Sequence, residues 1–211
     1  MKRKSSISPP RRRIVVWSAV TSVAAAVLCV VPPAAAQHAV SFPPPPVGVV
    51  NEFRYLGGAL VCISENEPRP RDRGLAPCLH IGAIAVDETT ERVDDRLGRP
   101  WKVVGGGRGE TIRVYPIHGD PEANPYFAVT FKAGRATAIQ LSGEETPDPY
   151  SFSGLRLGDS IRLLKDVLGP VTASEKLQGT ETTLLSYQPF PISIEVKNRK
   201  VVSIKIWAAH S

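Results

Sequence analysis

Two stretches of the chain, 80–142 and 153–208, repeat one order of apolar and polar positions. Each stretch opens with residues spaced i, i+3 and i+7, which places their side chains on one face of a helix. These residues are Thr90, Val93 and Leu97 in the first stretch and Ile161, Leu164 and Leu168 in the second. The spacing predicts a helix of about ten residues in each stretch.

Residues typical of helix ends flank both predicted helices. Gly98 and Gly169 follow the last apolar positions, and glycine adopts the positive φ of a C-terminal cap at low cost. A side chain before each helix can accept hydrogen bonds from its free N–H groups. The candidates are Asp87 or Thr89 in the first stretch and Asp159 or Ser160 in the second.

Segments rich in β-branched and aromatic residues follow each predicted helix. They are 111–117, 127–131 and 136–141 in the first stretch and 182–187, 192–196 and 202–206 in the second. Several alternate apolar and polar residues with a period of two, as in half-buried antiparallel strands. We therefore predict an α+β fold of two tandem repeats, each a helix followed by an antiparallel hairpin. The repeats are expected to share one antiparallel sheet, with both helices on one face.

The first 36 residues have the order of an export signal. A basic part (1–13) precedes an apolar part (14–31) and then a run of small residues. We predict cleavage between Ala36 and Gln37, which makes the protein periplasmic or secreted. An uncleaved membrane anchor is the alternative, because the apolar part could just span a bilayer; the membrane would then be contacted only through this segment.

The basic charge of the chain belongs to this export segment. The whole chain has 26 basic and 20 acidic residues, a net charge of +6. Residues 1–36 hold six basic residues and no acidic ones, so 20 of each sign remain in 37–211 and the net charge there is zero. This balance argues against a nucleic-acid partner, which requires a basic surface.

Two cysteines, Cys62 and Cys78, lie outside the export segment. A pair of cysteines in an exported chain favours a disulfide. A zinc site is disfavoured because only His80 lies near them, and a redox pair normally has a two-residue gap. We therefore expect a disulfide-closed segment at 59–79, which begins with a short strand. The proline run at 43–46 predicts that residues 37–58, which precede this segment, are a Pro-rich spacer.

The repeated unit resembles a known fold group. The matching stretches are 86–98 with Tyr115 and 127–141, and 157–169 with Tyr187 and 192–206. They are similar to the group of the β-lactamase inhibitor protein and the small outer-membrane-assembly lipoproteins of the SmpA/OmlA type. The resemblance implies an exported, non-enzymatic module that holds another protein on the exposed face of its sheet.

No local motif for nucleophilic catalysis, phosphate binding or metal binding occurs in the sequence. We therefore expect no enzyme activity, no cofactor and no metal. Two alternatives stay open. One is an envelope hydrolase with a dispersed site, built from groups such as His118, Asp120 and Glu122. The other is a small-ligand carrier with a pocket between helices and sheet.

Four aromatic residues lie on or beside the predicted strands. Large aromatic side chains on a sheet face anchor many protein interfaces, although core packing is the alternative for each of them. The candidates for protein binding are Trp101, Tyr115, Tyr126 and Tyr187. The leading hypothesis is an exported, monomeric protein that binds another envelope or secreted protein, as an inhibitor or an assembly factor.

Overall fold

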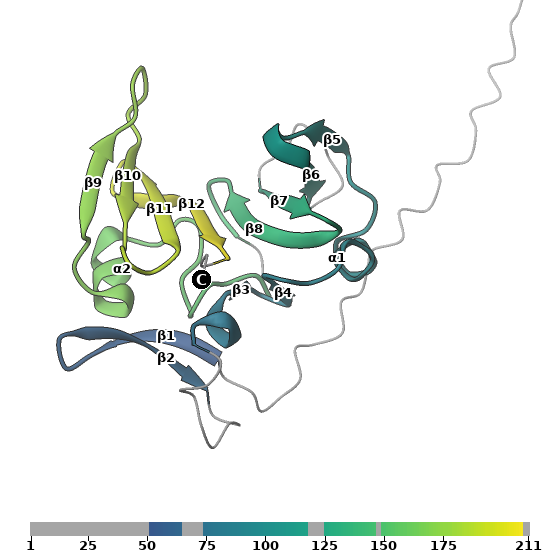
Figure 1. The fold of residues 1–211 in the computed structure, drawn as a ribbon. Coiled ribbons are helices and arrows are strands. Elements are labelled where there is room, and N and C mark those ends of the chain that lie inside the picture. The colour runs from purple at the N-terminus through teal and green to yellow at the C-terminus, as the bar shows by residue number, and fades with distance from the viewer. Residues whose placement is uncertain (1–50, 65–73, 118–124, 147–148, 209–211) are drawn as a thin grey trace, which may run out of the picture. The chain divides into compact units, whose positions relative to one another are not determined.

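The computed structural model describes residues 51–64, 74–117, 125–146 and 149–208. Its main sheet contains eight strands: β5 (Lys102–Gly105), β6 (Glu110–Pro116), β7 (Tyr126–Lys132), β8 (Arg135–Ser142), β9 (Ala173–Lys176), β10 (Thr183–Ser186), β11 (Ile192–Lys197) and β12 (Lys200–Trp207). Their order is β5-β6-β7-β8-β12-β11-β10-β9, and all neighbours are antiparallel. The pairing of β8 with β12 therefore joins two four-stranded halves into one sheet (Figure 1).

Two α-helices occur in the described residues, α1 (Thr90–Leu97) and α2 (Ile161–Leu168). Thr89 and Ser160 cap them, each accepting a hydrogen bond from the backbone N–H three residues later. Gly98 and Gly169 end them at φ of 80° and 78°. The predicted helix ends are thereby confirmed. Within the described ranges, no helix is long and apolar enough to cross a membrane.

The N-terminal part of the described chain forms a hairpin of β1 (Asn51–Leu56) and β2 (Ala59–Ser64). Strand β1 lies inside the range 37–58 that was assigned to a spacer, so at least this part of the range is a strand of the folded protein. Its Phe53 is fully buried, with ring centroids 5.8 Å from Phe152 and 6.0 Å from Phe190. A short 3-10 helix (Ala76–Cys78) and two-residue strands β3 (His80–Ile81) and β4 (Ile84–Ala85) follow.

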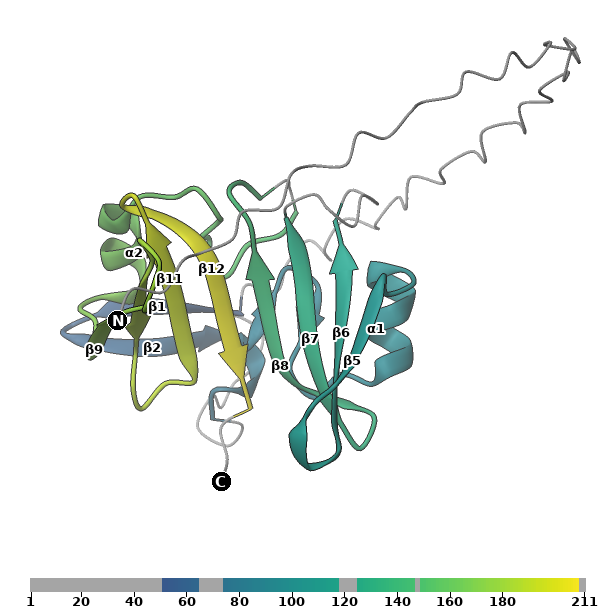
Figure 2. The same ribbon diagram turned by 90° about the horizontal axis from the view of Figure 1, so that it is seen from above.

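The core lies between the main sheet and the elements behind it. Figure 2 shows α1, α2 and the β1–β2 hairpin on one side of the strands. On that side, buried side chains pair across six strands in one row: Tyr115, Phe127, Leu141, Ile204, Ile194 and Leu185. The segment between β8 and α2 adds Tyr150, Phe152 and Leu155 to this core. Burying these rings and branched side chains supplies most of the driving force for folding.

The predicted fold class is wrong. The described chain is mostly β: four strands, rather than a hairpin, follow each helix, and the hairpin and β3–β4 add two small sheets. Strands β5 and β9 were missed because they are the edges of the main sheet and every residue in them is exposed. A strand exposed on both faces has no alternation of apolar and polar residues, which is the signal that sequence analysis reads.

Candidate functional site

The face of the main sheet turned away from the helices carries small and polar side chains. One row across it consists of Val114, Ala128, Gln140, Lys205, Ser193 and Ser186. These residues alternate along their strands with the core row, so they point to the opposite side. In Figure 2 this side faces the viewer, and no described helix lies in front of it. We call it the open face.

A small hydrogen-bond cluster lies on the open face where the end of β8 pairs with β12. Ser142 on β8 donates to Ser203 on β12 over 3.2 Å, and the Gln140 amide donates to both hydroxyls, at 3.2 and 3.0 Å. Ser142 and Ser203 are 8% and 2% exposed. Buried hydroxyls need such partners, and the cluster fixes the junction of the two halves of the sheet.

A hollow of about 520 Å³ lies on the open face. Small, uncharged residues form part of its lining: Thr130, Thr137, Ala138, Ser186 and Ser193. Larger side chains line it as well: Arg108, Glu110, Lys132, Lys205 and Trp207. The hollow therefore combines short side chains with charged and aromatic ones.

The charges at the hollow are unbalanced. Arg108, Lys132 and Lys205 contribute three cations, whereas Glu110 is the one carboxylate that lines it. None of the three cations forms an ion pair with a carboxylate within the described ranges. The described side chains that line the hollow therefore carry an excess of positive charge, although residues 37–211 carry no net charge. Glu175 and Glu195, opposite Leu184 in the strand register, lie on the same face outside this lining.

The structure divides the four predicted aromatic residues between surface and core. Trp101, just before β5, is 53% exposed, and Tyr126 is half-buried at the start of β7. Tyr115 and Tyr187 are 1% and 2% exposed, so their side chains pack in the core and are not available to a partner. The alternative that sequence analysis gave for each aromatic residue, packing in the core, therefore applies to Tyr115 and Tyr187.

Sequence analysis missed Trp207, which lines the hollow. A signal for it exists. Ile204 and Ile206 on β12 are fully buried, so the strand period of two assigns Trp207, with Lys205, to the other face. The cations of the hollow gave no comparable signal, because they come from three separate elements that only folding brings together.

Tyr115 connects α1 to β6. Its hydroxyl donates to Asp94 Oδ1 over 2.7 Å, and Arg113 Nη1 donates to Asp94 Oδ2 over 2.5 Å. Burial and the hydrogen bond to Asp94 raise the pKa of Tyr115. Asp94 is thus held by two donors from the strand that the helix packs against. This arrangement is structural, and it lies on the side opposite the hollow.

Tyr187 occupies the matching position in the second half and lacks such a partner. The two tyrosines are 72 residues apart, and the helices align with a shift of 71, which places Lys165 where α1 has Asp94. The Tyr187 hydroxyl is buried without a hydrogen-bond partner within the described residues. Burial raises the pKa of Tyr187 to about 12.

The two tyrosines should respond oppositely to removal of the hydroxyl. We expect Tyr115→Phe to lower the free energy of unfolding by about 1.5 kcal/mol, because Asp94 loses a charge-assisted hydrogen bond. Tyr187→Phe should leave stability unchanged or raise it by up to about 1 kcal/mol, because it removes a buried hydroxyl without a partner. Urea denaturation measures both variants, and equal losses would contradict the assignment.

The raised pKa of Tyr187 predicts a pH dependence. The hydroxyl has an ordinary pKa of 10.0 and one of about 12 when folded. Between these values the folded chain binds more protons than the unfolded chain, so stability falls as pH rises. Below pH 10 both forms are neutral and this contribution is constant. We expect Tyr187→Phe to show a shallower loss of stability than wild type above pH 10, measured by urea denaturation at several pH values.

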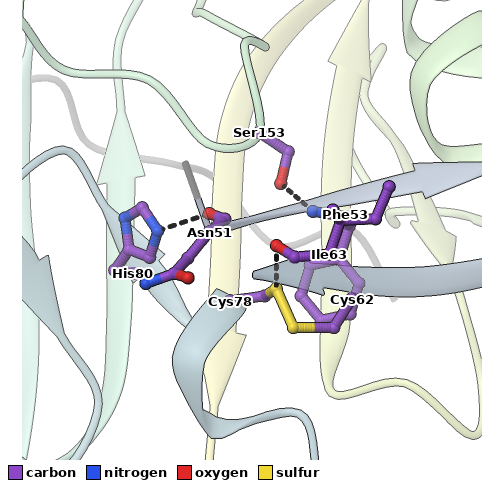
Figure 3. The surroundings of a disulfide bond; sticks show 7 residues. All are labelled: Asn51, Phe53, Cys62, Ile63, Cys78, His80 and Ser153. Carbon is purple, nitrogen blue, oxygen red and sulfur yellow. Dashed lines mark hydrogen bonds between the residues drawn. A yellow bond between two sulfur atoms is a disulfide. The ribbon is translucent and has the colours of Figure 1, made fainter. Parts of the chain in front are cut away.

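The region around the cysteines is a structural junction (Figure 3). Cys62 on β2 and Cys78 in the short 3-10 helix form a disulfide, which confirms the predicted pair. The His80 ring lies between two backbone carbonyls, with Nε2 2.7 Å from Asn51 O and Nδ1 2.9 Å from Gly82 O. The Phe53 N–H donates to the Ser153 hydroxyl over 2.8 Å. The contacts of Asn51 and Phe53 attach the hairpin to β3 and to the segment between the two halves, and the contact with Gly82 holds the His80 ring to the turn after β3.

Several predicted residues lie outside the described ranges. They are the cleavage site, Ala36 and Gln37, and the dispersed acid–base candidates His118, Asp120 and Glu122. Among the residues that are described, no group of three or more His, Cys, Asp or Glu could hold a metal ion.

Comparison with known proteins gives no family assignment. No protein-family model matches the chain, and no curated protein matches it. Among solved structures, the chain is similar to a DUF4309 family protein of Bacillus subtilis, with a TM-score of 0.39 and 18% identity over 57% of this chain and 78% of that one.

Two further solved structures share a comparable likeness. One is a cysteine-rich secretory protein of Staphylococcus aureus, with a TM-score of 0.40 and 17% identity over 58% of this chain and 44% of that one. The other is an extracellular protein of Bacillus anthracis containing an SCP domain, with a TM-score of 0.40 and 9% identity over 58% of this chain and 43% of that one. The matched region spans less than half of these two proteins, and TM-scores at this level do not establish a shared fold.

Proposed function

We propose that the chain is an exported, non-enzymatic protein that binds another envelope or secreted protein through the open face of its main sheet. The observation that carries the proposal is the hollow of about 520 Å³ on that face, lined by Trp207 and by three cations that form no ion pair within the described ranges. Helices, hairpin and linking segment all pack on the other side (Figure 2). No described helix or hairpin therefore has to move for a partner to reach this face.

The composition of the open face supports protein binding. Interfaces are rich in Trp, Tyr and Arg and gain most of their affinity from a few such side chains. Trp207 and Arg108 line the hollow, and Tyr126 lies on the same face. The disulfide supports the export part of the proposal, because disulfides persist in oxidising compartments outside the cytosol.

Site-specific photo-crosslinking tests the proposal. A benzophenone amino acid replaces Ala138, which lines the hollow, or Leu163, which is 40% exposed on α2 on the opposite side. We expect a discrete crosslinked protein from position 138 in living cells and none from position 163. Equal crosslinking from both positions, or none from 138 in correctly folded protein, would exclude the open face as the binding surface.

Mass spectrometry of the exported chain tests the export part separately. An N-terminus at Gln37 is expected if the signal is cleaved after Ala36. A chain that keeps its apolar segment would show the anchored alternative.

A further inference from the structure

We infer that the partner presents an acidic segment to the hollow, with carboxylates that pair with Arg108, Lys132 and Lys205 and an apolar side chain that packs on Trp207. This inference rests on the proposed function and names the chemistry of the partner. It follows from the charge and shape of the hollow.

Three cations converge on the hollow from separate elements. Arg108 lies in the short 3-10 turn between β5 and β6, where its φ is 60°. Lys132 ends β7, and Lys205 projects from the middle of β12. Three cations that line one concave surface raise the local potential more than the same charges spread over a convex one.

The surroundings of these cations leave them available. Lys205 lies between Gln140 and Ser193 in the strand register, and both neighbours are neutral. Lys132 is opposite Glu110, but no ion pair joins them in the described structure. By contrast, Arg113 on the helix side is paired with Asp94. Carboxylates from outside the chain can therefore satisfy the cations of the hollow.

The occupant is better matched by a protein segment than by a nucleic acid. The hollow has an excess of two positive charges, three cations against Glu110, whereas phosphate polymers are bound by long basic stripes. The indole of Trp207 and the side chain of Leu184 also line the hollow. They favour a segment that carries apolar side chains as well as carboxylates. Charge pairs at such a site speed association and fix orientation, and they weaken as salt screens them.

A fluorescence titration with poly-L-glutamate tests the inference on the full chain. The three tryptophans are Trp17, Trp101 and Trp207, so Trp17→Phe with Trp101→Phe leaves Trp207 as the only indole and reporter of the hollow. We expect a saturable change in its emission, with a Kd that rises about tenfold or more as salt increases from about 0.05 to 0.5 M. No saturable change would overturn the inference.

Matched charge reversals separate the hollow from the overall charge of the protein. Lys205→Glu changes a cation of the hollow, and Lys176→Glu changes an exposed lysine on the edge strand β9 by the same amount. We expect Lys205→Glu to weaken poly-L-glutamate binding about tenfold and Lys176→Glu to leave it near the wild-type value. Equal weakening by both variants would overturn the inference.

Two other anions serve as competitors. Inorganic phosphate and an oligothymidylate strand are titrated against the Trp207 signal at matched charge concentration. Weaker binding of both than of poly-L-glutamate supports the inference. Equal binding of phosphate would show a simple anion site, tighter binding of the oligonucleotide would show a nucleic-acid site, and either result overturns it.

Crosslinking from position 138 distinguishes failure of this inference from failure of the proposed function. If position 138 captures a partner and Lys205→Glu leaves the yield unchanged, the open face binds a protein but not through these charges. If position 138 captures none, the proposed function itself fails. A yield reduced by Lys205→Glu and kept by Lys176→Glu supports both.

Discussion

Replacing Cys62 and Cys78 together with serine is expected to lower the free energy of unfolding by about 3 kcal/mol. The two residues are 16 apart in sequence, and a crosslink across a loop of this size removes conformational entropy from the unfolded chain. The disulfide also joins β2 to the 3-10 helix that leads into β3. Without it, the β1–β2 hairpin keeps its packing on α2 but loses its covalent link to the rest of the chain.

Chemical denaturation with and without reductant measures this effect. Wild-type protein should lose about as much stability on reduction as the double serine variant loses by substitution. The variant should be insensitive to reductant, which controls for effects of the reductant elsewhere. If reduced wild type and the variant both retain the full wild-type stability, the disulfide does not stabilise the fold.

Gly169→Ala is expected to cost about 3 kcal/mol, whereas Gly98→Ala costs about 1 kcal/mol. The two glycines end α2 and α1 at φ of 78° and 80°, so alanine meets the same backbone strain at both. At Gly98 no atom lies within 4 Å of the added methyl group. At Gly169 the methyl group would overlap the ring of Tyr55 on β1. The difference between the variants therefore measures how closely the hairpin packs on α2.

A double-mutant cycle isolates this contact. Tyr55→Ala removes the ring, so Gly169→Ala in that background should cost about as much as Gly98→Ala. Urea denaturation of the single and double variants gives the coupling free energy. Equal costs of Gly169→Ala with and without Tyr55 would show that the hairpin adjusts freely and that the close approach is unimportant.

Local features of the fold could be predicted from the sequence. Thr89 and Ser160 were each one of two predicted cap candidates, and the terminating glycines were predicted outright, because caps depend on hydrogen bonds and φ values within a few residues. The turns at 133–134 and 198–199 are equally local features, since they are formed by residues with positive φ. The disulfide could be predicted because only two of the three cysteines lie outside the export segment, and two cysteines allow one pairing.

The arrangement of these elements could not be predicted in the same way. The fold class was wrong because β5 and β9 are exposed along their whole length and β1 lies next to a proline-rich run. Tyr115 and Tyr187 were grouped with Trp101 as possible contacts, yet burial separates them. The burial of a side chain depends on which elements pack against it, and those elements are distant in the sequence.

The sequence by itself determined where the helices begin and end, which strands alternate and which cysteines pair, since these depend on neighbouring residues. Only the tertiary structure decided which face of the sheet stays open. The contacts that close the other face join distant residues, such as Phe53 with Phe152 and Tyr55 with Gly169. The hollow with its three cations lies on the face that the described helices and the hairpin do not cover. Which face this is depends on long-range packing, because that packing decides which side chains are buried.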